Sequence, residues 1–108
     1  MKSLKDLLAA LDTLGIPYTQ IQWSPRLAPD LPYAVIVPES TRNRFADDVV
    51  AASPVAYFME LYTRERDVPL EKRVQDALDQ AGIGWNRYHT VDDDAPCVIA
   101  VYNMTLSE

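Results

Sequence analysis

Residues 55–82 read VAYFMELYTRERDVPLEKRVQDALDQAG, and this stretch decides the fold. Its first part places Val55, Tyr57, Met59 and Leu61 at every second position. A period of two is typical of a strand with one face against a core. The pattern predicts a long half-buried strand, followed by a charged turn at residues 63–67.

The second part of this stretch predicts an amphipathic helix. Pro69 fits the first helical turn, where its missing N–H costs no hydrogen bond, and Gly82 fits the end of the helix, where a left-handed residue is common. An apolar stripe at helical spacing lies between them, and it consists of Leu70, Val74, Ala77, Leu78 and Ala81. Strand, turn and helix follow one another without any catalytic group.

A second helix is predicted at the N-terminus. Ser3 and Asp6 have the spacing of a capping-box pair, and Gly15 with Pro17 ends the helix. Its apolar face consists of Leu4, Leu7, Leu8, Leu11 and Leu14.

The remaining segments predict strands and loops. Strands are expected at residues 18–23, 33–37, 45–52, 85–90 and 97–106 besides the one at 55–62, and loops at 24–32 and 91–96. We therefore expect a single α+β domain over residues 1–108, with a mainly antiparallel sheet of about six strands and two helices packed on one face.

Composition limits the classes of function. With 108 residues and 48% hydrophobic content, the chain can build one core. Ten basic and sixteen acidic residues give a net charge of −6, which argues against duplex DNA and anionic membranes as partners. One cysteine, Cys97, allows no internal disulfide and is interpreted as a buried apolar residue. We expect no transmembrane segment and folding in a cytoplasm.

No catalytic or metal-binding motif is found. The chain has one histidine, His89, and no glycine-rich phosphate loop. The run Asp92–Asp94 lacks the ligand spacing of a calcium loop and is interpreted as a hairpin turn. We expect no enzyme and no cofactor or metal.

Two charged turns are the candidate interaction sites. Opposite charges mix in both, and such charges set the register and partner of a subunit contact. The alternative is that these are ordinary solvated turns. The residues concerned are Arg42, Arg44, Asp47 and Asp48 in one segment, and Arg64, Arg66 and Asp67 in the other.

Several short matches run along the chain. The pattern of a strand ending in ELYT, a charged turn, PLEK, a helix and then glycine–isoleucine with a following aromatic resembles a family of small tail proteins of tailed bacteriophages and prophages. Further matches are Gly15–Tyr18, Leu31–Tyr33, Phe45–Asp47 and Val101–Met104. Cys97, the 24–32 loop and the Asp92–Asp94 run have no counterpart in this pattern.

The resemblance implies a structural virion protein that is assembled in the host cytoplasm. Similar proteins are tail terminators or tail-completion proteins at the head–tail junction, where a ring, often hexameric, stops polymerisation of the tail tube. The implied partners are further copies of the chain, the tail-tube protein and the head–tail connector.

Three alternatives stay open at this point. One is a head–tail connector or minor capsid component. Another is a bacterial regulatory or ligand-binding module, with an apolar pocket lined by Trp23, Trp85 and Tyr102. The third is an enzyme, which would need a cluster of titratable groups.

Overall fold

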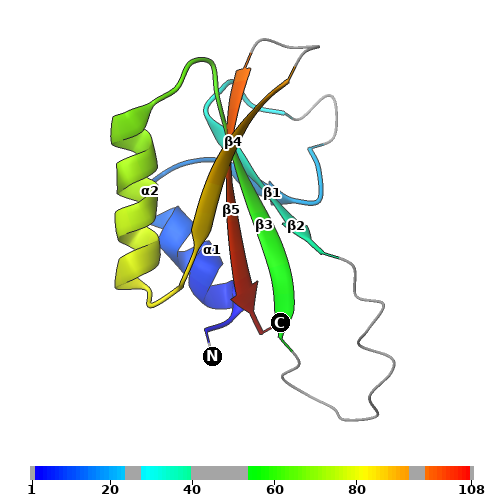
Figure 1. Ribbon diagram of the computed structural model, residues 1–108, viewed down its shortest axis with the longest axis vertical. Helices are drawn as coiled ribbons and strands as arrows, with labels where there is room; N and C mark the ends of the chain where they lie inside the picture. Colours follow the sequence, from blue (N-terminus) through cyan, green and yellow to red (C-terminus); the bar gives the residue numbers. More distant parts are fainter. Residues whose placement is uncertain (1, 24–27, 40–53, 93–96, 108) are drawn as a thin grey trace.

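The computed structural model describes residues 2–23, 28–39, 54–92 and 97–107. They form two helices and one five-stranded sheet (Figure 1) with the strand order β1-β2-β3-β5-β4. The elements in chain order are α1 (Leu4–Asp12), β1 (Tyr18–Gln20), β2 (Tyr33–Pro38), β3 (Val55–Thr63), α2 (Val68–Gln80), β4 (Asn86–Asp92) and β5 (Cys97–Leu106).

The α+β class and the placement of both helices on one face are as expected from the sequence (Figure 1). The sheet differs from the prediction in two details. Its described part has five strands, because the strand expected at residues 45–52 lies outside the described residues. In addition, β1 pairs with β2 in parallel, whereas the other neighbouring strands are antiparallel.

The parallel pair at one edge has a local cause. Residues 21–32 separate β1 from β2, and a connection of about a dozen residues is long enough to return the chain to the same end of the sheet. β1 is also shorter than the strand expected at 18–23, because Ile21 adopts a left-handed conformation with φ 73°. A β-branched residue in that region cannot continue a strand.

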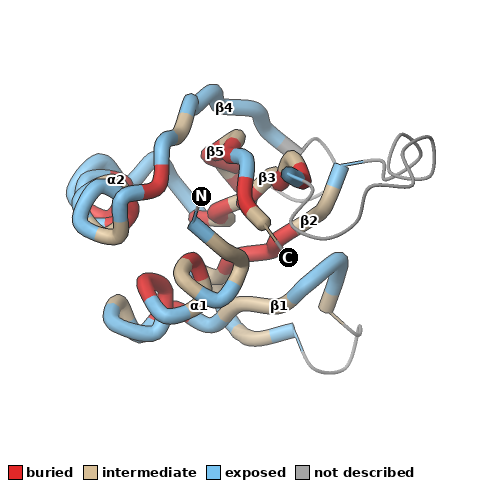
Figure 2. The backbone as a smooth tube through the Cα atoms, turned by 90° about the horizontal axis from the view of Figure 1, so that it is seen from below, coloured by how far each residue is buried: buried red, intermediate tan, exposed pale blue. Residues whose placement is uncertain are grey.

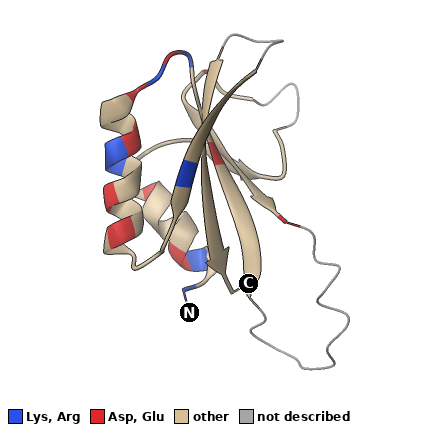
Figure 3. Ribbon diagram, in the orientation of Figure 1, with Lys and Arg blue, Asp and Glu red and all other residues tan. Residues whose placement is uncertain are grey.

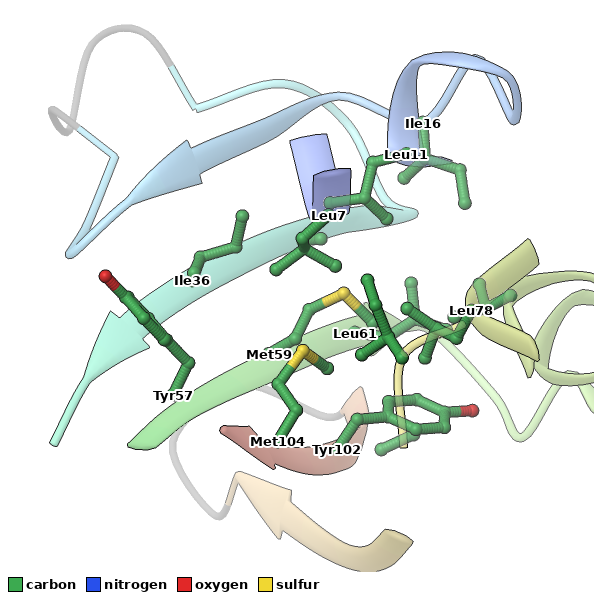
Figure 4. Packing of buried hydrophobic residues seen from close by; sticks show 14 of the residues in the cluster. Leu7, Leu11, Ile16, Ile36, Tyr57, Met59, Leu61, Leu78, Tyr102 and Met104 are labelled. Atoms are coloured by element: carbon green, nitrogen blue, oxygen red, sulfur yellow. The ribbon is translucent and has the colours of Figure 1, made fainter. Parts of the chain in front are cut away.

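Alternation along β3 divides its side chains between the two faces of the sheet, as predicted. Val55, Tyr57, Met59 and Leu61 are at most 4% exposed, and they point toward the helices. Figure 2 shows the buried segments gathered between the helices and the sheet. Figure 4 shows the centre of this core, to which the helices contribute Leu7, Leu11 and Leu78, and β5 contributes Tyr102 and Met104.

The opposite face of the sheet carries a smaller apolar cluster. Cys97, Ile99 and Val101 of β5 are buried there, and Leu31, Phe58 and Tyr62 pack against them. Cys97 is buried, as the sequence indicated.

Helix α1 begins with the expected cap, and α2 has the expected proline in its first turn. Ser3 and Asp6 form a capping box on α1, in which the Ser3 backbone N–H donates to Asp6 Oδ2 at 2.8 Å. This hydrogen bond holds the pKa of the Asp6 carboxyl below its usual value. At the other ends, Gly15 and Gly82 have φ of 70° and 75°, the left-handed conformation predicted for them.

Leu78→Ala tests the packing of α2. Leu78 is 0% exposed, so truncation removes apolar contacts and leaves a cavity, and we expect a loss of about 2–5 kcal/mol in the free energy of unfolding. Chemical denaturation measures it. Gln80→Ala on the exposed side of the same helix is the control and should change stability by less than about 0.5 kcal/mol. Equal effects would show that the helix faces are misassigned.

Candidate functional site

Of the two predicted charged segments, the turn between β3 and α2 is the one that lies within the described residues. Arg64, Glu65, Arg66 and Asp67 are all exposed, and they lie at one end of the sheet (Figure 3). Thr63 anchors the start of the turn, because its buried hydroxyl donates to the Val98 carbonyl at 3.4 Å. An open hollow beside the turn is lined by Leu31, Pro32, Pro69 and the turn residues.

The three predicted interface residues of this turn differ in what they contact. The Asp67 carboxylate caps α2 by accepting from the Leu70 N–H at 3.0 Å, so it has a structural task. Arg66 Nε lies 3.8 Å from Glu71 Oε2, and the Arg66 side chain is 54% exposed. Arg64 has no ion-pair partner among the described residues. Of the three predicted residues, Arg64 is therefore the one whose charge is available to a neighbour.

Arg42, Arg44, Asp47 and Asp48 lie outside the described residues. The residues that border their segment are at the opposite end of the sheet from the Thr63–Asp67 turn, because the Glu39 N–H donates to the Ala56 carbonyl near the start of β3. β3 has nine residues and spans roughly 27 Å. The two predicted segments are thus attached at the two ends of the sheet.

A buried carboxylate that the sequence analysis missed lies next to the turn. Glu71 is 2% exposed. Its Oε1 accepts hydrogen bonds from Arg87 Nη1 at 3.1 Å and lies 3.0 Å from His89 Nε2. Because a buried charge is costly without partners, these two residues of β4, together with Arg66 near Oε2, allow Glu71 to be buried.

This Glu71 cluster connects α2 to the edge strand β4. Arg87 and His89 alternate along β4 and so point to the same side. The polar contacts continue to the Tyr102 hydroxyl, which lies 3.2 Å from Gln75 Nε2. Since the carboxylate is 2% exposed and its partners come from a neighbouring element, the cluster is interpreted as a brace between helix and strand.

A signal for Glu71 was present in the sequence. Glu71 lies three residues before Val74 and seven before Leu78, which puts it on the apolar stripe of the helix. A carboxylate on such a stripe needs a cationic partner, and Arg87 and His89 share one face of the strand predicted at 85–90. Their position relative to the helix was what the sequence did not show.

The three aromatic residues suggested for a ligand pocket do not come together. Tyr102 is fully buried under the helices and contacts Trp85 edge-on, with ring centroids 5.7 Å apart. Trp23 contacts Tyr33, and Tyr33 stacks on Tyr62 at 5.1 Å. Tyr62 points to the other face of the sheet, because it alternates with Leu61 on β3. The pocket expected from Trp23, Trp85 and Tyr102 is therefore not formed.

Comparison with known proteins assigns no family. No protein-family model matches the sequence, and no curated protein matches it either. The resemblance to phage tail proteins thus stays a hypothesis. Among the described residues, no group of histidine, cysteine and acidic side chains has the arrangement of a metal site. Neither described helix is long and apolar enough to cross a membrane.

Glu71→Gln tests the brace. The substitution removes the charge that Arg87 and His89 contact, so we expect a loss of about 1–3 kcal/mol in unfolding free energy. The loss stays in this range because both partners are partly exposed, at 32% and 29%, and can regain water. Asp76→Asn is the control: it breaks the exposed ion pair with Lys72 and should cost less than about 0.5 kcal/mol. Similar losses in both variants would contradict the brace.

Because the Tyr102 phenol is buried, we expect the protein to lose stability at alkaline pH. Burial raises the pKa of its phenol, and burial together with Glu60 does the same for Tyr62. Because the folded pKa lies above the unfolded value of about 10, the stabilisation is complete below about pH 10 and is lost as pH rises through the folded pKa. Denaturation between pH 8 and 11, as approximate limits, should show this fall. It should be smaller in Tyr102→Phe and unchanged in Tyr88→Phe, which removes an exposed hydroxyl. If stability falls as much in Tyr102→Phe as in the wild type, other groups cause the fall.

Proposed function

We propose that the chain is a structural protein of a phage or prophage tail, a tail terminator or tail-completion protein. In this proposal copies of the chain form a ring at the head–tail junction and stop polymerisation of the tail tube. The chain acts in the virion without catalysis and without a cofactor. Its partners are further copies, the tail-tube protein and the head–tail connector.

The observation that carries the proposal is the Thr63–Asp67 turn. Its backbone is held at both ends, by Thr63 on β5 and by Asp67 on α2, while the Arg64 charge between them has no ion-pair partner in the described part of the chain. A charged group on a fixed backbone suits a subunit contact, because its position costs little ordering on binding. The short sequence matches to tail proteins are the reason for proposing that this contact forms in a phage tail.

The two ends of the sheet fit a part that lies between two neighbours. A ring requires a head-to-tail contact between copies, and a ring on a tail also presents one side to the tube and the other to the connector. The Thr63–Asp67 turn lies at one end of β3, and the segment carrying Arg42, Arg44, Asp47 and Asp48 is attached at the other. A head–tail connector or minor capsid component would use the same two ends and is the alternative.

Arg64→Glu in the phage or prophage that encodes the chain tests the proposal. The change reverses an exposed charge, so the free energy of unfolding should stay within about 0.5 kcal/mol of wild type. We expect virion yield to fall and electron microscopy to show tails of abnormal length, as after deletion of the gene. Lys5→Glu is the matched control, because Lys5 is exposed on α1, away from the turn, and the charge change is the same.

Different defects distinguish the alternatives. Tails of normal length that fail to join heads would favour a connector or minor capsid role. Normal virions after deletion of the gene would refute a part in the virion. Normal virions from Arg64→Glu alone would remove the turn from the interface.

A further inference from the structure

Strand β4 is an outer edge of the sheet, and it lacks several of the features that commonly protect such edges. Among the described strands it pairs only with β5, in a continuous register over Asn86–Asp92. Residues 86–91 are all exposed, and Tyr88 and Val91 are 50% and 64% exposed. The strand contains no proline, lysine or bulge, the usual obstacles to pairing with another strand.

The two basic side chains of β4 already have a partner within the chain. Arg87 and His89 both contact the buried Glu71 carboxylate, at 3.1 and 3.0 Å. Charges on an edge strand keep other strands away, but here one carboxylate of α2 offsets them. The Glu71 cluster thus leaves residues 86–91 without an unpaired cation.

We propose that the β4 edge pairs with β4 of a second copy, antiparallel and centred on His89. The two five-stranded sheets would then form one continuous sheet across a twofold axis. The other outer strand, β1, has three residues and ends at the left-handed Ile21. β1 offers a much shorter edge than the seven residues of β4. The β4 strand of the second copy is therefore the better pairing partner.

The sequence of β4 is complementary to itself in this register. His89 is the midpoint of Asn86–Asp92, so pairing about it uses the whole strand. Tyr88 then lies opposite Thr90 of the second copy, an aromatic residue beside a β-branched one, which is a favourable cross-strand pair. Arg87 lies opposite Val91. Pairing about Tyr88 instead would place Arg87 opposite His89, bringing two basic residues together, and would shorten the contact.

The pairing is inferred from β4 alone and does not rest on the proposed tail function. A twofold contact uses the same surface on both copies and closes after two, whereas a ring needs a head-to-tail contact such as the Thr63–Asp67 turn could supply. The edge contact alone is small, and small interfaces are weak. We therefore expect a dimer that forms as concentration rises.

Disulfide trapping tests the register. In a Cys97→Ala background, Tyr88→Cys and Thr90→Cys chains of different mass are mixed under oxidising conditions. Directly opposite residues have Cα atoms about 4.5–5.5 Å apart, within reach of a disulfide, so the mixed dimer should far exceed either homodimer. Mixing Lys5→Cys with Thr90→Cys measures random collision. A mixed yield no higher than this control, or a dominant Tyr88→Cys homodimer, would overturn the proposed register.

Charge placement at residue 91 tests the contact without cysteines. Light scattering on the full chain, up to a concentration on the order of 1 mM, should show the mass rising toward a dimer. Val91→Lys faces Arg87 of the other copy and should restore the monomer, whereas Val91→Glu should preserve or strengthen the dimer. A wild-type monomer throughout, equal effects of the two substitutions, or a larger species unaffected by Val91→Lys would each overturn the pairing. All of these outcomes are independent of tail length in the virion.

Discussion

The two-residue period of β3 is the constraint on which the rest of the structure depends. This strand lies at the centre of the sheet, between β2 and β5, and its odd-numbered residues from Val55 to Thr63 are buried. A shift of its pairing by one residue would turn the whole set toward the other face. The positions of both helices follow, because α1 and α2 cover the same apolar surface. So does the Thr63–Asp67 turn, which begins where that surface ends.

Glu71 is a charged residue in a core that is otherwise mostly apolar. The α2 stripe would be apolar throughout with a leucine at this position, yet the carboxylate is buried and contacts Arg87 and His89. Replacing a buried ionic group by apolar residues often leaves stability unchanged or raises it, so stability alone does not account for the cluster. Its contacts with two alternate residues of β4 restrain the direction of a strand that, among the described strands, pairs only with β5. The cluster thus controls both the shape and the charge of the free edge.

Much of the fold could be predicted from the sequence because periodicity and caps are local. β3, β5, both helices, the capping box and the left-handed glycines all follow from residues close together in the chain. The parallel pairing of β1 with β2 depends on the path of residues 21–32, and Ile21 gives no sign in the sequence of its left-handed conformation. The Glu71 cluster was missed because it needs the distance between a helix and a strand, whereas its three residues each look ordinary alone. The same applies to Trp23 and Tyr102, which lie on opposite faces of the sheet.

The candidate sites differ in how much the fold depends on them. Asp67 and Glu71 hold α2 in place, so their substitution changes folding and binding together. Arg64, Tyr88 and Val91 are exposed, and the core does not depend on them. A head-to-tail contact through Arg64 would lie beyond the end of β3, whereas a twofold contact would run along the outer strand β4. The two surfaces approach each other at one end of the sheet, where Thr63 and Val91 both pair with Val98. If both contacts form and the twofold axis crosses the ring axis at a right angle, the result is a double ring. A single ring on a tail therefore requires the β4 pairs to separate first, and a small, weak edge contact permits that separation.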